Sequence, residues 1–162
     1  EAARRGIFMF NMHALGGPAM MRQAVDEVSR LTREQHLPRP IMLAVTVLTS
    51  MGQQDLQALG ITIPLNELVI RLARSAREAG MDGVVASAQE TEMIKKECGK
   101  QFLVVTPGIR PASAQAHDQK RTMTPAQAVR VGADYIVVGR PVTEAPDPLA
   151  AVKSIITELE NA

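Results

Sequence analysis

Aromatic side chains are scarce in this chain, which has three Phe, one Tyr and no Trp among 162 residues. Proteins that bind single-stranded nucleic acid stack the bases on such rings. A formal net charge of +1 also gives no broad basic face that would attract a phosphate backbone. The sequence therefore argues against a nucleic-acid partner, and it requires a core built mainly from Val, Ile, Leu, Met and Ala.

Cysteine is almost absent as well, since Cys98 is the only one in the chain. A single cysteine excludes an internal disulfide and a cysteine-rich metal site, and it fits a reducing compartment. No apolar run is long enough to span a membrane, and the amino terminus has no signal-like pattern. We therefore expect a soluble, cytoplasmic protein without a metal site. Its length and 46% hydrophobic content fit a single domain over residues 1–162.

Short apolar runs alternate along the chain with stretches of helical periodicity, and no linker or low-complexity segment interrupts them. Such alternation is typical of an α/β protein with a parallel sheet. The expected strands are 7–13, 41–47, 83–86, 102–105 and 134–138, and the expected helices are 17–35, 55–59, 64–79, 91–98, 125–131 and 149–159.

These elements make about five strand–helix units, whereas a closed (β/α)8 TIM barrel has eight and takes roughly 250 residues. The first six residues, EAARRG, resemble the end of a helix with a glycine cap, and no initiator Met precedes them. We therefore expect an incomplete, C-terminal portion of a barrel whose N-terminal strands are absent from this chain. An open, doubly wound five-stranded sheet is the alternative, and it would bind its ligand at a topological switch point.

Two motifs at strand ends predict an anion site. Residues 105–111, VTPGIRP, and 138–141, VGRP, each complete or follow an apolar run that is predicted to be a buried strand. The glycine in each motif lets the backbone approach a ligand, and Arg110 and Arg140 can pair with phosphate oxygens. Because the carboxyl ends of neighbouring parallel strands meet at one rim, both motifs are expected to hold one phosphate group.

A short repeat, Gly-x-Asp followed by an apolar strand, occurs at residues 80–85 and 132–137. The glycine can end the preceding helix in a left-handed conformation, and the aspartate turns the chain into the strand. These aspartates, Asp82 and Asp134, fall at the amino ends of the strands, away from the rim where barrels bind their ligands. We therefore predict structural roles for both.

Five segments of the chain resemble orotidine 5'-phosphate decarboxylase of the bacterial type. They are TVLTSM at 46–51, DGVVASAQE at 82–90, VTPGIRP at 105–111, Asp118-Gln119, and GRPVT at 139–143. The resemblance covers essentially the whole chain, and the order of the last three segments is specific to that family. It implies a (β/α)8 barrel of the ribulose-phosphate-binding type. Such a barrel would decarboxylate orotidine 5'-monophosphate to UMP in pyrimidine biosynthesis, as a homodimer and without a metal or an organic cofactor.

The same resemblance implies roles for individual residues. Arg140 and the Gly139 amide would hold the 5'-phosphate, and Gln119 would contact both the phosphate and the pyrimidine. Thr49 and Ser50 would lie close to the base, where Ser50 could hydrogen-bond its imide edge. The complete set of predicted substrate-binding residues is Thr49, Ser50, Pro107, Arg110, Gln119, Gly139 and Arg140.

Residues 112–122 are mostly small or polar, and they separate a predicted strand end from a predicted helix. Such a segment can act as a mobile lid that closes when Gln119 contacts phosphate, with an ordinary surface loop as the alternative. We expect its basic side chains, His117, Lys120 and Arg121, to be solvated.

The family's catalytic signature, Asp-x-Lys-x-x-Asp, does not occur in this sequence. In the family it supplies the lysine that protonates the C6 carbanion, and it lies just before the region that matches Glu1. We therefore name no catalytic residue, and we expect this chain to bind the nucleotide without decarboxylating it. The alternatives are a noncatalytic phosphate-ligand-binding fragment and another sugar-phosphate barrel enzyme.

Overall fold

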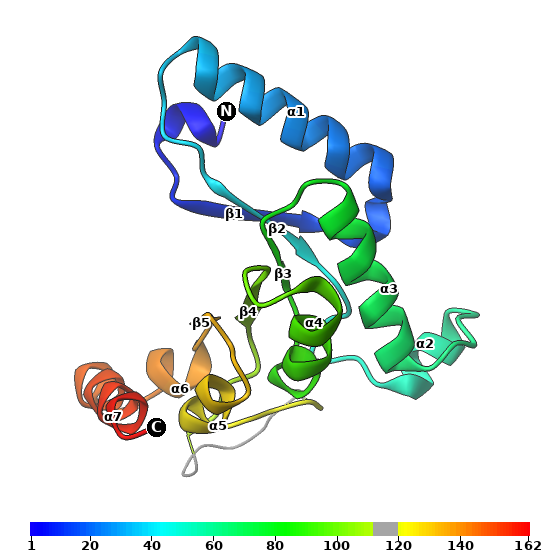
Figure 1. Cartoon of the computed structure of the whole chain (residues 1–162). Helices are drawn as coiled ribbons and strands as arrows, with labels where there is room; N and C mark the ends of the chain where they lie inside the picture. Colours follow the sequence, from blue (N-terminus) through cyan, green and yellow to red (C-terminus); the bar gives the residue numbers. More distant parts are fainter. Residues whose placement is uncertain (112–119) are drawn as a thin grey trace.

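The computed structural model describes residues 1–111 and 120–162, and these form a parallel sheet of five strands (Figure 1). Each strand pairs with the next one along the chain, in the order β1-β2-β3-β4-β5. A barrel wall has this consecutive order, whereas a doubly wound sheet reverses at a switch point, so the doubly wound alternative is wrong. The strands are β1 (Met9–His13), β2 (Ile41–Val45), β3 (Gly83–Val85), β4 (Leu103–Thr106) and β5 (Tyr135–Ile136).

Helices connect the strands where the periodicity predicts them, with ends that differ by only a few residues. The helix expected at 91–98 is found as Thr91–Cys98. The sequence does not predict α6, because a single turn is too short to show periodicity. Within the described ranges, no helix is long and apolar enough to cross a membrane. The helices are η1 (Ala3–Arg5), η2 (Ala14–Gly16), α1 (Pro18–Glu34), α2 (Gln53–Ala58), α3 (Leu65–Glu78), η3 (Ala88–Glu90), α4 (Thr91–Cys98), α5 (Pro125–Arg130), α6 (Arg140–Thr143) and α7 (Pro148–Glu160).

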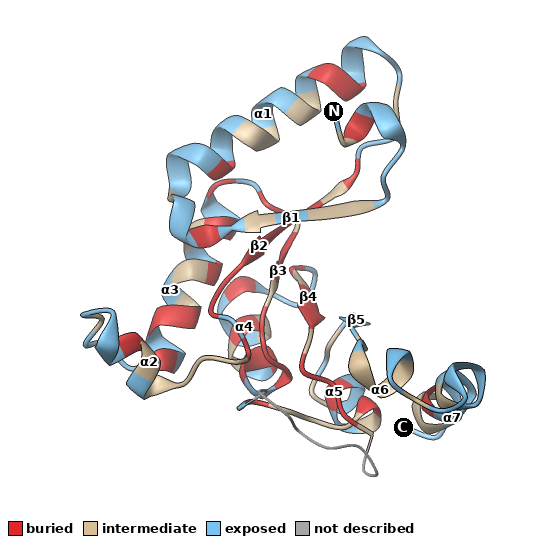
Figure 2. Cartoon of the chain, turned by 180° about the vertical axis from the view of Figure 1, so that it is seen from behind, coloured by how far each residue is buried: buried red, intermediate tan, exposed pale blue. Residues whose placement is uncertain are grey.

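One face of the sheet packs against helices. Ala44, Val84 and Val104 form a row across β2, β3 and β4, and all three are fully buried. Val69 of α3 and Ile94 of α4 belong to the same buried cluster. Figure 2 shows the buried residues following these strands and continuing into α3 and α4. The predicted aliphatic core is therefore confirmed.

The opposite face of the sheet is concave. Val45, Val85 and Val105 form its central row. Phe8, just before β1, and Tyr135 of β5 contact each other with their ring centroids 6.4 Å apart. In a flat sheet the first and fifth strands would lie roughly 19 Å apart, with parallel side chains. The ring contact therefore requires strong curvature, as in the wall of a barrel.

The last strand corrects one prediction. Residues 134–138 were expected to form a buried strand, but β5 contains only Tyr135 and Ile136. Tyr135 is 40% exposed and Val137 is 49% exposed. The reason is that β5 is the edge of the described sheet and pairs only with β4, so one side of it has no neighbouring strand.

The two Gly-x-Asp repeats have the predicted structural role. Gly80 and Gly132 both have a positive φ, of 85° and 92°, which a glycine adopts without steric cost. The Asp82 carboxylate accepts a hydrogen bond of 2.7 Å from the Met42 amide of the preceding strand, and it pairs with Arg39 at 2.7 Å. Each aspartate thus ties the start of its own strand to the previous one.

Asp134 makes the equivalent contacts at the start of β5, and its replacement gives a first prediction. Its Oδ2 accepts hydrogen bonds from the Val104 amide at 2.7 Å and from Lys95 Nζ at 2.6 Å. Asp134→Asn is expected to lower the free energy of unfolding by about 1–2 kcal/mol, because both bonds lose their ionic component. Urea denaturation measures the change. Glu97→Gln, which breaks an exposed pair with Arg74, should cost less than about 0.5 kcal/mol, and equal losses would contradict the role of Asp134.

Candidate functional site

Two adjoining hollows open at the carboxyl ends of the strands. The first, which we call the Ser50 hollow, has a volume of about 200 Å³ and lies beyond β2 and β3. Its wall includes Val45 and Val85 of the concave face, together with Thr49, Ser50 and Pro107. The wall is thus mostly apolar, with hydroxyl groups on one side. This combination suits a flat heterocycle with a polar edge.

The second, the Arg140 hollow, has a volume of about 350 Å³ and lies beyond β4 and β5. Arg110 and Arg140 both line it, and none of its described lining residues is acidic. Arg140 is the first residue of α6, directly after β5 and its short extension. Two guanidinium groups among described lining residues that include no carboxylate make a candidate anion site. Thr49 and Pro107 line both hollows, so the two are neighbours.

The glycines of the two motifs open the backbone to the Arg140 hollow. Gly108 has a φ of 77°, a left-handed conformation that a residue with a Cβ rarely adopts. A Cβ added at Gly139 would meet no heavy atom within 4 Å, so open space lies beside this backbone. Peptide groups at both positions line the hollow. The backbone can therefore approach a bound anion from both strand ends.

Arg110 is held by the chain around it. Arg110 is only 8% exposed, and its Nη1 donates a hydrogen bond of 2.8 Å to the Ile109 carbonyl. Its backbone amide donates to the Met123 carbonyl at 2.9 Å. The motif after β4 is thus fixed against the chain that returns after the predicted lid.

The structure brings most of the predicted substrate-binding residues to one place. Gln119 and residues 112–118 of the predicted lid lie outside the described residues. The ligand roles of the gathered set stay predictions, since the geometry shows only that they share a rim. The residues that line one or both hollows are Thr49, Ser50, Pro107, Arg110, Gly139 and Arg140.

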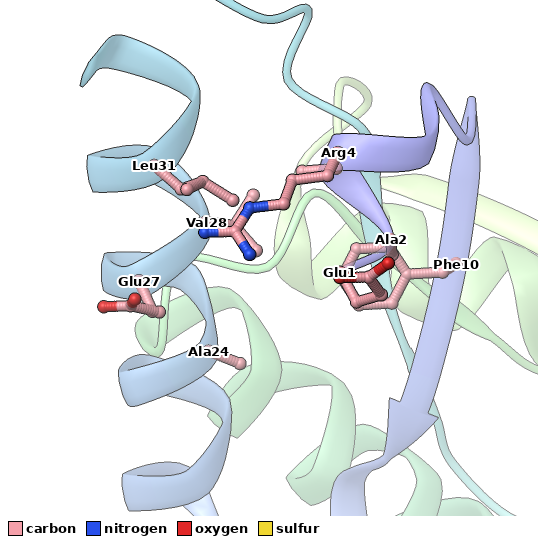
Figure 3. A pocket seen from close by; sticks show the side chains of 9 residues that line it. Glu1, Ala2, Arg4, Phe10, Ala24, Glu27, Val28 and Leu31 are labelled. Carbon is pink, nitrogen blue, oxygen red and sulfur yellow. The ribbon is translucent and has the colours of Figure 1, made fainter. Parts of the chain in front are cut away.

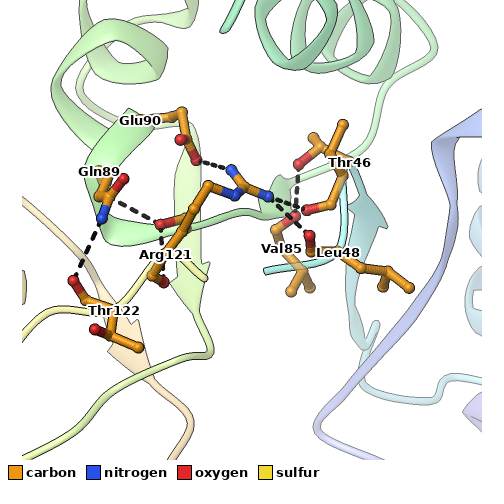
Figure 4. A network of polar contacts seen from close by, with 9 residues as sticks. Thr46, Leu48, Val85, Gln89, Glu90, Arg121 and Thr122 are labelled. Carbon is orange, nitrogen blue, oxygen red and sulfur yellow. Dashed lines mark hydrogen bonds and ion pairs between the residues drawn. The ribbon is translucent and has the colours of Figure 1, made fainter. Parts of the chain in front are cut away.

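The burial of Arg121 shows that another prediction was wrong. This arginine was expected to be solvated, but it is 7% exposed, and its Nη1 donates to Glu90 Oε2 at 2.6 Å (Figure 4). Glu90, at the end of η3, is 2% exposed. The guanidinium can be buried because a carboxylate and backbone carbonyls accept its hydrogen bonds. No spacing in the sequence pairs these two residues, which lie 31 positions apart, so only the fold reveals their contact.

Arg121 also contacts the chain that follows β2. Its Nη2 donates to the carbonyls of Val47 and Leu48, each at 2.9 Å. These two residues directly precede Thr49, whose own carbonyl accepts a hydrogen bond of 3.2 Å from the Lys120 amide. The carboxyl-terminal end of the predicted lid, residues 120–122, is therefore bound to the loop that lines both hollows.

Burial shifts two pKa values near the sheet. Burial raises the pKa of the Glu90 carboxyl, and the positive charge and hydrogen bond of Arg121 offset part of that rise. Burial also raises the pKa of the Cys98 thiol on α4, so the only cysteine stays protonated and is not a candidate nucleophile. Among the described residues, no group of three or more His, Cys, Asp or Glu side chains could hold a metal ion.

A further hollow, of about 340 Å³, lies between the amino-terminal residues and α1 (Figure 3). Arg4 reaches across it from η1 toward α1, and Phe10 of β1 also faces it from the side opposite α1. Glu27 of α1 adds a negative charge to its lining. None of the predicted substrate-binding residues lines this hollow, and its charges are mixed. We therefore place the candidate site at the carboxyl ends of the strands.

A family model and several curated relatives match this chain. The family model "Orotidine 5'-phosphate decarboxylase / HUMPS family" matches residues 1–155. The orotidine 5'-phosphate decarboxylase of Geotalea uraniireducens (strain Rf4) is 55% identical over 159 residues, which are 98% of this chain and 65% of that protein. The enzyme of the same name from Geotalea daltonii is 52% identical over 159 residues, covering 66% of its length. The chain thus spans 65% of the length of the first of these curated relatives.

A solved structure gives the same result for the fold. Orotidine 5'-phosphate decarboxylase from Lactobacillus acidophilus matches with a TM-score of 0.81 and 40% sequence identity, over 99% of this chain and 66% of that one. This likeness confirms the predicted fold class, an incomplete portion of a (β/α)8 barrel. The extent of the family match and the identity to the relatives lead to one conclusion: the chain belongs to the orotidine 5'-phosphate decarboxylase / HUMPS family.

Proposed function

We propose that this chain supplies the phosphate- and base-binding part of an orotidine 5'-phosphate decarboxylase, which converts orotidine 5'-monophosphate into UMP and CO2 in pyrimidine biosynthesis. One observation carries the proposal: a cationic hollow and a mostly apolar hollow adjoin at the strand ends and share Thr49 and Pro107. A nucleotide has matching parts, an anionic phosphate at one end and a flat heterocyclic base at the other. Family membership and the names of the relatives support this substrate.

The ligand's parts are assigned by the chemistry of each hollow. The 5'-phosphate lies in the Arg140 hollow, where Arg140, Arg110 and the Gly139 amide face it. The pyrimidine lies in the Ser50 hollow, where the Ser50 hydroxyl hydrogen-bonds the imide edge. The ribose then lies at the shared boundary. Gln119 keeps its predicted contact with both the phosphate and the pyrimidine.

Binding without turnover is the activity that we propose for this chain taken alone. Phosphate contacts accelerate a reaction only when their binding energy acts on the reacting centre in the transition state. The sequence has no Asp-x-Lys-x-x-Asp segment to protonate the carbanion, so the contacts described above have no such centre to act on. The reaction that the family resemblance implies needs no metal or organic cofactor.

Calorimetric titration of this chain with UMP, uridine and inorganic phosphate tests the proposal. UMP is expected to bind tighter than uridine by at least about tenfold, because a charge-assisted contact adds roughly 1.5–3 kcal/mol. Uridine that binds as tightly as UMP would refute the phosphate assignment. Ribulose 5-phosphate that displaces UMP efficiently would favour another sugar-phosphate enzyme. Orotidine 5'-monophosphate should be bound but not decarboxylated, and measurable release of CO2 would contradict the binding-only role.

Two further properties belong to the same proposal. The resemblance implies a homodimer with sites near the subunit interface, and light scattering on the purified chain would measure its mass in solution. A chain that stays monomeric at high concentration would contradict the dimer. A cytoplasmic location also stays a prediction, as does a single domain over residues 1–162.

A further inference from the structure

The loop after β2 lines both hollows, and part of what holds it comes from a distant segment. The Val47 and Leu48 carbonyls accept hydrogen bonds of 2.9 Å from Arg121 Nη2, and the Thr49 carbonyl accepts one of 3.2 Å from the Lys120 amide. Three consecutive carbonyls of the loop thus point toward residues 120–121. The position of Thr49 and Ser50 at the hollows therefore depends on where Arg121 is held.

Glu90 holds Arg121 from the other side. The carboxylate lies after β3, at the start of α4, and it accepts the 2.6 Å bond from Nη1 (Figure 4). The side chains are 8% exposed for Arg121 and 2% exposed for Glu90, so water does not screen the pair. The planar guanidinium can serve the carboxylate and both carbonyls at the same time, whereas a lysine ammonium cannot reproduce this fork.

The backbone carbonyls of residues 121–122 also accept hydrogen bonds from the turn after β3. Ser87 Oγ donates a long hydrogen bond of 3.5 Å to the Arg121 carbonyl, and Gln89 Nε2 donates to the Thr122 carbonyl at 3.4 Å. These donors belong to the turn after β3, next to Glu90. Residues 120–122 therefore lie between the loop after β2 and the turn after β3, and they contact both.

We infer that Glu90 and Arg121 form a positioning pair for base recognition, holding the loop of Thr49 and Ser50 in the register that the pyrimidine requires. Neither residue lines the two hollows, so neither is expected to contact the nucleotide. The inference rests on the proposed function, because it assigns the base to the Ser50 hollow. Thr49 of this loop also lines the Arg140 hollow, but the groups assigned to the phosphate, Arg140 and the Gly139 amide, follow β5 and lie outside the loop. The pair should therefore affect binding of the base and leave binding of the phosphate unchanged.

The test compares three variants by titration with UMP and with inorganic phosphate. Arg121→Lys and Glu90→Gln should each weaken UMP binding by on the order of tenfold, because a displaced loop misplaces its contacts. The affinity for inorganic phosphate should stay unchanged in both. Asp134→Asn is the matched control, since it lowers stability from the amino end of the strands without touching the loop. Its affinity for UMP should equal that of the unaltered chain.

Two results of the titrations would overturn the inference. If folded Arg121→Lys or Glu90→Gln binds UMP as the unaltered chain does, the pair is only structural and the inference is overturned. If phosphate binding falls in parallel with UMP binding, the loss is general and the inference also fails. Should one variant not fold, the other carries the comparison. Circular dichroism at the titration temperature identifies the folded ones.

Hydrogen exchange separates this inference from the proposed function. If the unaltered chain binds no UMP, the proposed function fails, and exchange then decides whether the pair fixes the loop. Faster exchange at residues 46–52 in Arg121→Lys, with β1 unchanged, supports a positioning role. Exchange that is unchanged in this loop, or raised equally throughout the sheet, overturns it.

Discussion

Arg121→Met is expected to lower the free energy of unfolding by about 3–5 kcal/mol, the cost of breaking a buried ion pair by removing one partner. The variant would leave the Glu90 carboxylate buried without its cation, and the Val47 and Leu48 carbonyls would lose a donor. Urea denaturation followed by circular dichroism measures the loss. The exposed pair supplies a control: Arg74→Met should cost less than about 1 kcal/mol.

The double variant Arg121→Met, Glu90→Leu should be less destabilised than the sum of the two single variants, since it removes the uncompensated charge as well. Strict additivity would show that the two residues do not interact as the 2.6 Å contact implies. A loss below about 1 kcal/mol in Arg121→Met would contradict burial of the pair.

The pKa of Glu90 adds a dependence on pH. Burial raises this pKa above its usual 4.5, so the folded state holds the proton more tightly than the unfolded state does. Stability from this group is therefore greatest at low pH and falls as the pH rises through the folded pKa. Removing Arg121 removes the opposing effect and raises the pKa further. The deficit of Arg121→Met should accordingly shrink as the pH falls through the raised pKa of Glu90 in the variant, which a series of urea denaturations at decreasing pH would measure.

Arg140→Ala is expected to weaken UMP binding by about 1.5–3 kcal/mol, a factor of roughly 10 to 150. The guanidinium would no longer face the phosphate in the hollow that it shares with Arg110. Uridine binding should not change, because the Ser50 hollow stays intact. Isothermal titration of both ligands measures the difference.

A second arginine provides the matched control for this charge change. Arg130 lines a separate hollow near the amino ends of the strands, with Asp134, and its removal also deletes one positive charge. Arg130→Ala should leave the affinity for UMP within about twofold of that of the unaltered chain, because solvent screens an exposed charge at the opposite ends of the strands. A UMP titration of Arg140→Ala that matches the unaltered chain would refute the role given to Arg140.

The elements of the fold were largely predictable because they depend on local patterns. The 3.6-residue periodicity of α1 and α3 is long and clear, so both helices are found where the sequence places them. The end of the sheet was harder. The residues of β5 look like those of a buried strand, but burial depends on what lies beside the strand, which its own sequence does not state.

The candidate site was predictable to the extent that it follows from topology. Carboxyl ends of parallel strands share a rim, so motifs after β2, β4 and β5 had to meet there once the strand order was consecutive. The contact of Glu90 with Arg121 had no such basis. A charged residue in a polar segment is solvated by default, and only the packing of three loops shows that this arginine is an exception.

The structure of this chain in complex with UMP tests the central claim most directly. The account predicts the phosphate within hydrogen-bond distance of the Arg140 guanidinium and the Gly139 amide, with the pyrimidine in the Ser50 hollow. A phosphate bound away from Arg140, or a pyrimidine outside the Ser50 hollow, would contradict it.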